Sequence, residues 1–405
     1  MDQGRPTVTA AAPIERARTL LQLRRPADAE RELRGVLVQE PQNAMAHAFL
    51  AVALTEQRRG QEAVATAGEA VRLVPDFWFG HYVAGQALFR AGRYDEAIAA
   101  LRTALNLNLS YAPIWEVLAR IHLHRGEWSL TVDAARRGLE IDPEESDLVS
   151  LLALGLSGLG QTAAAGDAAA QAVRLSPESA LAHLVYGRAA LARGRAGEAA
   201  EAFREVLRLD PSFGQARDLL VAALKQRNPL YRWLERLRGR FFGGWRLVLL
   251  LPVAPPLIAV FVLIALLHWA AWVAEAFTTL RLTRARATSL LFEAGESRVA
   301  VLCCGLLAAG AALLALGIAL AGEPVGTAGV AVMALVTPVQ EAAHTGSPLG
   351  RRILFGWVGL LAVAAIVSAA LGAVAGALLS CYAALATIWI AAGVRRLLAP
   401  APDPV

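Results

Sequence analysis

Four ionisable residues lie in or beside the apolar stretches of the C-terminal half, and they are the first candidates for chemistry. His268 and Glu275 fall within one apolar stretch, and Glu341 and His344 lie in the loop expected before Arg351. Ionisable groups are costly inside a membrane and are usually functional there. Glu341 and His344 would share one face if that segment were helical, but a metal ion needs three or four protein ligands. The sequence therefore predicts no metal site and no cofactor.

Other short motifs that could carry catalysis lie in the wrong places. His122 and His124 are two residues apart on an expected helix, so they point in nearly opposite directions and cannot share a metal. Residues 155–158 spell the GxSG of an intramembrane serine protease, but they lie outside the apolar half. The sequence contains no phosphate-binding loop, no dinucleotide fingerprint, no HExxH zinc motif and no convincing strand. We therefore predict that the protein is not an enzyme and has no catalytic residues.

The composition divides the chain into two parts. Its 405 residues are 56% hydrophobic, with a mean hydropathy of +0.45, which is too apolar for an ordinary soluble protein. Residues 1–246 carry most of the charge, and residues 247–394 are long apolar stretches broken by short arginine-bearing segments. Because those arginines border apolar stretches, we assign them to membrane topology and anionic lipid, and we expect no nucleic-acid partner. The three cysteines, without metal-binding spacing, are expected to be small buried side chains. They are Cys303, Cys304 and Cys381.

Residues 10–211 contain a repeat of 34 residues. Stepping by 34 from Pro41 gives a proline at five of six positions, small residues recur at the same interval, and glycines close the first half of four units. The prolines are 41, 75, 143, 177 and 211, one series of small residues is Ala17, Ala51, Gly85, Ala119, Ala153 and Gly187, and the glycines are 92, 126, 160 and 194. Each unit is typical of two short antiparallel helices that approach closely at the small residues. Such units must stack, because none can bury its apolar face alone.

This pattern resembles the tetratricopeptide repeat (TPR) family, whose units carry small residues and a closing proline at the same offsets. Six units fit, beginning near residues 10, 44, 78, 112, 146 and 180. After Pro211 a single helix is expected to cap the last unit with a polar side. That side holds Gln215, Arg217, Asp218 and Lys225. We therefore predict an all-α fold with a TPR solenoid and capping helix over residues 10–227, preceded by a tail over residues 1–9.

The resemblance also implies where a partner would bind, because in this family the first helix of each unit lines the concave surface. The corresponding positions in the third and fourth units hold Phe79, Tyr82, Gln86, Phe89, Arg90, Glu116, Arg120 and His124. Aromatic and arginine side chains dominate binding energies, so a segment with apolar anchors and an acidic group would fit best. The alternative is that the aromatic residues only complete the packing between units. The groove holds no lysine, so it is not expected to bind a chaperone C-terminus, as one subgroup of the family does.

Residues 228–246 are predicted to form a basic amphipathic segment beside the membrane. Its apolar face holds Leu230, Trp233, Leu234 and Leu237, and its basic face holds Arg232, Arg236 and Arg240. A boundary tryptophan and arginines that can reach lipid phosphates are typical of a helix lying on a membrane surface. The alternative is a linker helix packed on the repeats.

Residues 247–394 are predicted to form a polytopic bundle of transmembrane helices. Three apolar stretches with internal helix breakers are each long enough for a hairpin, because one span needs about 20 residues. They are roughly 241–280, 299–339 and 353–394. The leading half of the first stretch is short and contains Arg246, so this stretch could cross only once. We prefer six segments and keep four or five as the alternative. Hairpins place every arginine-bearing connection, the repeats and the C-terminal tail over residues 395–405 on one side, which the positive-inside rule assigns to the cytoplasm.

The sequence thus predicts a multi-pass protein of a bacterial inner membrane with a cytoplasmic TPR solenoid. Lys225 is the sole lysine, which hints at a GC-rich bacterial genome, and no apolar signal peptide opens the chain. The expected function is a scaffold that recruits a partner protein through the groove while its arginine-rich segments contact membrane lipids. The alternative is a transport or envelope-biogenesis component whose bundle acts on a lipid-linked or small substrate. The lack of paired charges expected within the apolar stretches weighs against this alternative.

Overall fold

The computed structural model describes residues 8–241, 257–284, 291, 292 and 294–397. Every long element in these residues is an α-helix, so the all-α prediction is confirmed. The chain divides into two compact units, Met1–Ala216 and Arg217–Val405. The division falls inside α13 (Gly214–Gln226), so most of the helix predicted to cap the repeats belongs to the C-terminal unit.

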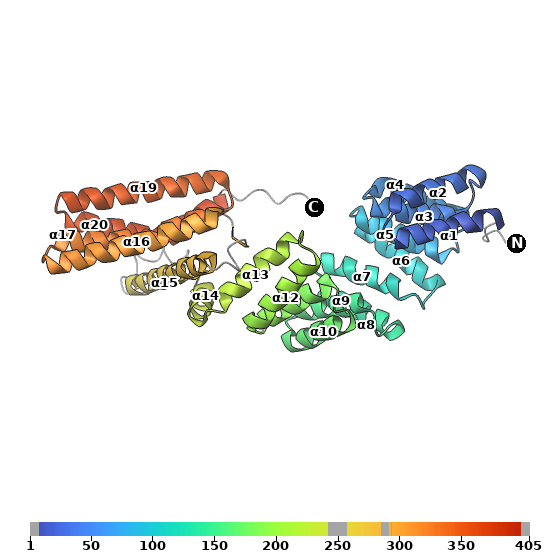
Figure 1. The fold of residues 1–405 in the computed structure, drawn as a ribbon, viewed down its shortest axis with the longest axis horizontal. Helices are drawn as coiled ribbons and strands as arrows, with labels where there is room; N and C mark the ends of the chain where they lie inside the picture. The colour runs from blue at the N-terminus through green and yellow to red at the C-terminus, as the bar shows by residue number, and fades with distance from the viewer. Residues whose placement is uncertain (1–7, 242–256, 285–290, 293, 398–405) are drawn as a thin grey trace. The chain divides into compact units, whose positions relative to one another are not determined.

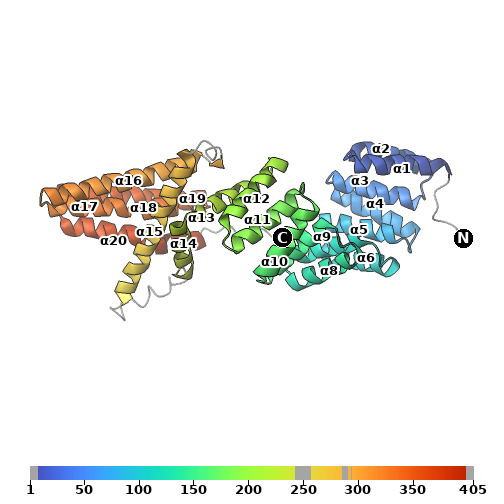
Figure 2. The same ribbon diagram turned by 60° about the horizontal axis from the view of Figure 1, so that its bottom comes forward.

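The N-terminal unit is a stack of antiparallel helix pairs (Figures 1 and 2). The pairs are α1 (Val8–Gln22) with α2 (Pro26–Gln39), α3 (Ala44–Glu56) with α4 (Gly60–Leu73), α5 (Trp78–Arg90) with α6 (Tyr94–Leu107), α7 (Ala112–His124) with α8 (Trp128–Ile141), α9 (Ser146–Gly158) with α10 (Thr162–Leu175), and α11 (Ala180–Ala192) with α12 (Ala196–Leu209). Each pair occupies one predicted unit and packs on the next pair. The predicted repeats are therefore confirmed.

The turn inside each pair has the same backbone geometry in all the repeats. A residue with positive φ follows the first helix, as a left-handed C-terminal cap requires. These residues, one repeat apart, are Arg24, Arg58, Gly92, Gly126, Gly160 and Gly194. Glycine adopts this conformation freely, whereas it costs any other L-residue about 1–2 kcal/mol. The first two turns, which carry arginine, are therefore strained relative to the other four.

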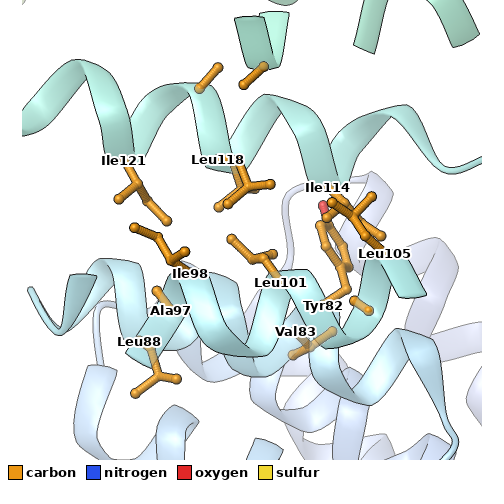
Figure 3. Close-up of a cluster of buried hydrophobic side chains, with 14 of the residues drawn as sticks. Tyr82, Val83, Leu88, Ala97, Ile98, Leu101, Leu105, Ile114, Leu118 and Ile121 are labelled. Carbon is orange, nitrogen blue, oxygen red and sulfur yellow. The ribbon is translucent and has the colours of Figure 1, made fainter. Parts of the chain in front are cut away.

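Small residues lie where the two helices of a pair approach most closely. A Cβ atom on Gly85 would stand 2.5 Å from the Leu101 side chain, and one on Gly187 would stand 2.5 Å from the ring of Phe203. Between pairs the core is made of larger side chains. Figure 3 shows Leu101 of α6 pointing toward Leu118 of α7 within one such cluster.

The C-terminal unit consists of α13 and seven further helices of the described chain. They are α14 (Pro229–Phe241), α15 (Leu257–Arg284), α16 (Ala294–Ala319), α17 (Glu323–Ala334), α18 (Val336–Ala343), α19 (Pro348–Ala370) and α20 (Val374–Leu397). Among these residues, five stretches are long and apolar enough to cross a membrane, and α17 with α18 forms one of them. The stretches are Val262–Arg284, Gly295–Ala319, Glu323–Ala343, Pro348–Ala370 and Val374–Arg395.

The long helices follow the predicted hairpins in two of three cases. Helix α16 packs on α17, and α19 packs on α20. The breaks fall at Gly322 and Gly372, which are among the helix breakers inside the second and third stretches. The leading half of the first predicted hairpin, residues 242–256, lies outside the described residues. The loop predicted around Glu341 is wrong, because that segment is the helix α18, whose first turn accommodates Pro338.

Helix α14 corresponds to the predicted basic amphipathic segment. Leu234 on its apolar side is buried against Ala271 and Ala274 of α15. Leu230 and Trp233 on the same side are 57% and 55% exposed. The helix therefore packs on the apolar bundle through one part of its apolar side and leaves another part uncovered.

Candidate functional site

Aromatic side chains from three neighbouring repeats meet on the first helices of the N-terminal unit. The ring of Phe79 lies 5.2 Å from that of Phe49 on α3 and 6.0 Å from that of Tyr82. Tyr111, at the start of α7, lies 5.2 Å from Tyr82 and 4.8 Å from Trp78. We call these five residues the aromatic cluster. Ring pairs of this kind contribute about 0.5–1.5 kcal/mol each beyond the area they bury.

Tyr82 belongs to the packed core rather than to an open surface. It is 8% exposed, and its hydroxyl oxygen lies 2.6 Å from the Gln86 amide nitrogen, which donates the hydrogen bond. Burial raises the pKa of Tyr82 above its ordinary value. For Tyr82 the packing alternative is therefore the better description, while Phe79 is only partly buried at the edge of the same core.

A second group of rings lies at the other end of α5. The ring of Phe89 is 5.4 Å from that of His124 on α7 and 6.0 Å from that of Tyr94 on α6. His124 stacks on Tyr94 at 6.3 Å. Arg90 beside them is exposed and makes no ion pair with any described residue. Exposed aromatic rings and an arginine without an ion pair therefore lie together at this end of α5. These residue types are typical of binding surfaces.

Arg120 is held between two carboxylates. Its guanidinium lies 2.6 Å from Glu116 on the same helix and 2.8 Å from Asp147 on α9. Burial raises the pKa of Glu116 even though Arg120 opposes the shift. The positive charge that Arg120 would offer to an acidic group of a partner is therefore largely neutralised, and Arg90 is the better candidate to meet such a group.

The C-terminal unit contains a polar cavity of about 430 Å³ where α13, α15, α16, α18 and α19 come together. It lies at the ends of the apolar stretches that carry the arginines. Its polar lining includes Lys225, Glu275, Thr279, Glu296, Arg298, Gln340, His344 and Arg351. Of this set, only Glu275 and His344 were considered from the sequence as candidates for chemistry.

An ion pair closes one side of this cavity. The ammonium of Lys225 lies 2.8 Å from a carboxylate oxygen of Glu275, and His344 Nε2 lies 3.5 Å from the same oxygen. The side chains of Lys225 and Glu275 are 14% and 7% exposed. The expectation that Lys225 lies on a solvated polar side of a capping helix is wrong, because its charge is buried against α15.

A second buried ion pair lies nearby on other helices. Glu341 is 1% exposed, accepts a 2.6 Å hydrogen bond from Arg395 of α20 and a 3.2 Å bond from the Trp272 indole. Glu341 and His344 thus take different partners and do not form the shared site considered from their spacing. The expected lack of paired charges among the apolar helices is also wrong.

The remaining candidates have structural explanations. His268 is 2% exposed and its Nδ1 bonds to the carbonyl oxygen of Ile264 one turn earlier. Cys303 and Cys381 are buried free thiols, in agreement with the prediction, whereas Cys304 is only partly buried. Across the residues that the structure describes, no group of three His, Cys, Asp or Glu side chains could hold a metal ion.

One feature of the sequence, its single lysine, could have pointed to the cavity. Lys225 is the only lysine in the chain, and its ammonium is the group that reaches Glu275. Thr279 and Gln340 carried no signal, because single polar residues among apolar ones are common at helix ends.

Comparison with known proteins places the N-terminal unit. A model of the tetratricopeptide repeat matches residues 14–76, 82–146 and 151–212. Among solved structures, the chain is similar to the APC/C hetero-tetramer Cut9–Hcn1, with 19% identity and a TM-score of 0.50 over 53% of this chain and 43% of that chain. It is also similar to pilF of Pseudomonas aeruginosa, with 20% identity and a TM-score of 0.45 over 53% of this chain and 97% of that chain. These identities show a shared fold alone, and comparison with curated proteins gives no match.

Proposed function

We propose a function that starts from one fact: the N-terminal half of this chain belongs to the tetratricopeptide repeat family. Repeats of this family generally bind protein or peptide partners. In this chain they are joined to five helices long and apolar enough to cross a membrane. That combination is the observation that carries the proposal, which is a multi-pass scaffold that recruits a partner protein to a membrane.

The distribution of arginines supports a cytoplasmic position for the repeats. Arg281 and Arg284 end α15, Arg298 opens α16, and Arg351 opens α19. The connections at the opposite ends, 320–322 and 371–373, hold no basic residue. The positive-inside rule assigns the arginine-bearing ends to the cytoplasm. With no lysine in the membrane part to share this role, the arginines also support contact with anionic lipids of a bacterial inner membrane.

The exposed end of α5 is the surface we assign to the partner. Phe89 and His124 offer aromatic faces, and Arg90 offers an unpaired charge among the described residues. An amphipathic or extended segment with an apolar anchor and one acidic residue would match this surface. We assign Phe79 as a secondary contact. The other predicted groove residues support this surface through packing and hydrogen bonds and do not contact the partner; they are Tyr82, Gln86, Glu116 and Arg120.

A photo-crosslinking amino acid in the full-length protein tests the partner surface. Placed at Phe89 or His124 in intact membranes, it should give one dominant adduct, which the substitution Arg90→Glu should abolish. The matched control is Arg102, which is exposed on the second helix of the same repeat and should give no such adduct. Equal adducts from the control position, or an adduct that survives Arg90→Glu, would refute this surface.

Reporter fusions test the membrane topology. Alkaline phosphatase, which is active only outside the cytoplasm, should be active when fused after Glu323 and inactive when fused after Arg352. The reverse result would place the repeats outside. A protein that alkaline carbonate strips from membranes would contradict the membrane-anchored scaffold altogether.

The polar cavity favours a second candidate function. A pair such as Lys225 with Glu275 is rare among apolar helices and often marks a substrate path. The chain would then be a transport or envelope-biogenesis component whose bundle acts on a lipid-linked or small substrate. Glu275→Gln separates the two functions, because loss of function with intact membrane insertion and an intact adduct at Phe89 would favour this candidate.

A further inference from the structure

We propose that the polar cavity of the C-terminal unit is a binding site for the phosphate-bearing headgroup of an anionic membrane lipid. The inference deepens the proposed function, because it rests on the membrane anchoring of the bundle. It goes beyond general attraction between arginines and lipid, since it assigns one headgroup to one cavity of about 430 Å³.

Two unpaired cations line the cavity. Arg298 lies in the first turns of α16 and Arg351 in the first turn of α19, and both side chains are exposed. Neither guanidinium group makes an ion pair or hydrogen bond with any other residue that the structure describes. Two guanidinium groups can each give two parallel hydrogen bonds to a phosphate, which is the geometry that favours arginine over lysine in phosphate sites.

Two buried polar side chains line the same cavity without a partner. Gln340 is 3% exposed and Thr279 is 6% exposed. Within the described chain, the Gln340 amide and the Thr279 hydroxyl make no side-chain hydrogen bond. Because both side chains line the cavity and have no side-chain partner among the described residues, their polar atoms are available to a ligand. A headgroup with hydroxyl or ester oxygens beside its phosphate would satisfy both.

The acidic residues of the cavity are already occupied. Glu275 accepts from Lys225 at 2.8 Å and faces His344 at 3.5 Å, and Glu296 is engaged in an interaction within the protein. The charges left open to a ligand are therefore the two arginines. The first turns of α16 and α19 add partial positive charge from their backbone N–H groups, so the open side of the cavity favours an anion.

The surroundings of the cavity favour a lipid over a soluble phosphate. Phe355 lines the cavity and is 38% exposed. Ile353 on the same helix is 50% exposed, and Val301 on α16 is 55% exposed. These apolar side chains continue from the cavity along α16 and α19, whereas a soluble anion would use only the polar part of this surface. Acyl chains descending along α16 and α19 from a bound headgroup would cover them.

Native mass spectrometry of the full-length protein, released from phosphatidylcholine nanodiscs that contain a minor fraction of phosphatidylglycerol, tests the site. One phosphatidylglycerol molecule should remain bound. The double variant Arg298→Gln/Arg351→Gln should weaken its binding by about tenfold or more, as expected for lost charge-assisted hydrogen bonds. Thr279→Val and Gln340→Leu should each weaken it by a smaller factor, which checks the cavity without changing its charge.

The matched control is Arg284→Gln/Arg352→Gln, which removes the same charge from two exposed arginines that do not line the cavity. Retention close to that of the unmodified protein is expected. Equal loss in the control, or unchanged binding in Arg298→Gln/Arg351→Gln, would overturn the proposal. Displacement of the lipid by millimolar inorganic phosphate would also overturn it, because the cavity would then select the free anion.

Failure of this inference is distinguishable from failure of the proposed function. A protein that is extracted by carbonate refutes membrane anchoring and with it both proposals. A protein that stays in the membrane and gives the Phe89 adduct, yet shows no selective phosphatidylglycerol, refutes the cavity site alone.

Discussion

The two units of the protein hold their charges in opposite ways. In the repeats, many ion pairs join exposed residues three positions apart in the sequence, such as Arg93, which caps α6, with Glu96 at 2.5 Å. In the C-terminal unit, Lys225 pairs with Glu275 and Arg395 pairs with Glu341 across different helices, with carboxylates only 7% and 1% exposed. The repeats thus use charge for solubility, whereas the C-terminal unit depends on a few buried pairs.

The difference has an energetic consequence. An exposed pair loses little when one partner is removed, because water and salt replace the interaction. Removal of one partner from a buried pair leaves an uncompensated charge and costs about 3–5 kcal/mol. The repeats should therefore tolerate substitutions of their charged residues, and their weak points should lie in backbone geometry and close packing instead.

The largest effect is expected from Arg395→Leu. This change leaves the carboxylate of Glu341, 1% exposed, with the Trp272 indole as its remaining side-chain donor, and should lower the free energy of unfolding by about 3–5 kcal/mol. Thermal unfolding of the full-length protein in detergent micelles would measure it.

The double variant Glu341→Leu/Arg395→Leu should recover much of this loss, because both charges are then gone. Glu96→Gln, which breaks the exposed pair in the repeats, should leave the midpoint unchanged. A single variant as stable as the unmodified protein, or an equal loss in Glu96→Gln, would contradict the comparison.

A smaller effect is expected where two helices of a repeat touch. A Cβ on Gly187 would stand 2.5 Å from Phe203, which is fully buried, so Gly187→Ala should cost about 1–3 kcal/mol through overpacking. Gly35→Ala is the matched control, since no atom lies within 4 Å of its added Cβ. Alanine there should stabilise the helix by about 0.5–1 kcal/mol. Opposite shifts of the unfolding midpoint of the repeats are expected, and shifts of the same sign would argue against close approach at Gly187.

The turns give a stabilising prediction. Arg58 adopts φ 61° at the position where later repeats carry glycine, so Arg58→Gly should raise the free energy of unfolding by about 1 kcal/mol. Gly92→Ala at the equivalent turn should lower it, because its φ is 77°. Equilibrium denaturation monitored by circular dichroism would compare them. If Arg58→Gly destabilised the protein, the stabilisation from the arginine side chain would have to exceed the cost of its strained backbone.

The repeats could be predicted almost completely because the residues that define each turn and helix crossing recur at a fixed interval in the sequence. Pro41, Gly92 and the buried alanines recur at one interval, and each recurrence marks the same turn or helix crossing in the structure. The apolar helices were also predictable from length and composition, and the breaks at Gly322 and Gly372 from helix-breaking residues.

The polar contacts of the C-terminal unit could not be predicted because the residues that pair are far apart in the sequence. Lys225 and Glu275 are 50 positions apart, and Arg395 and Glu341 are 54 apart. No periodicity relates such residues, and each one alone resembles a solvated charge or an isolated polar residue. The same holds for Arg120, whose second carboxylate, Asp147, comes from another repeat.

The smallest expected effect concerns two carboxylates of the repeats, Glu116 and Glu30. Their contributions to the free energy of unfolding should depend on pH with opposite signs. Burial raises the pKa of Glu116 above 4.5, so the folded state holds that proton more tightly than the unfolded state. Its contribution to stability is present below pH 4.5 and is lost as the pH rises through the folded pKa. The hydrogen bond from Gln57, with those from Arg34 and Arg59, lowers the pKa of Glu30 below 4.5. Its contribution is present above that value and is lost as the pH falls.

Glutamine at each position removes the titration and keeps the shape. We expect the unfolding midpoint of Glu116→Gln, relative to that of the unmodified protein, to rise between about pH 4 and pH 7, the range just above an ordinary carboxyl pKa. For Glu30→Gln the relative midpoint should fall as the pH rises from about 3 to 5, because only the unmodified protein gains stability from ionisation there. Midpoints measured for the three full-length proteins across this range would show the opposite slopes. Parallel slopes would mean that Arg120 outweighs the burial of Glu116, and that the fourth repeat holds its charges as the exposed pairs of the other repeats do.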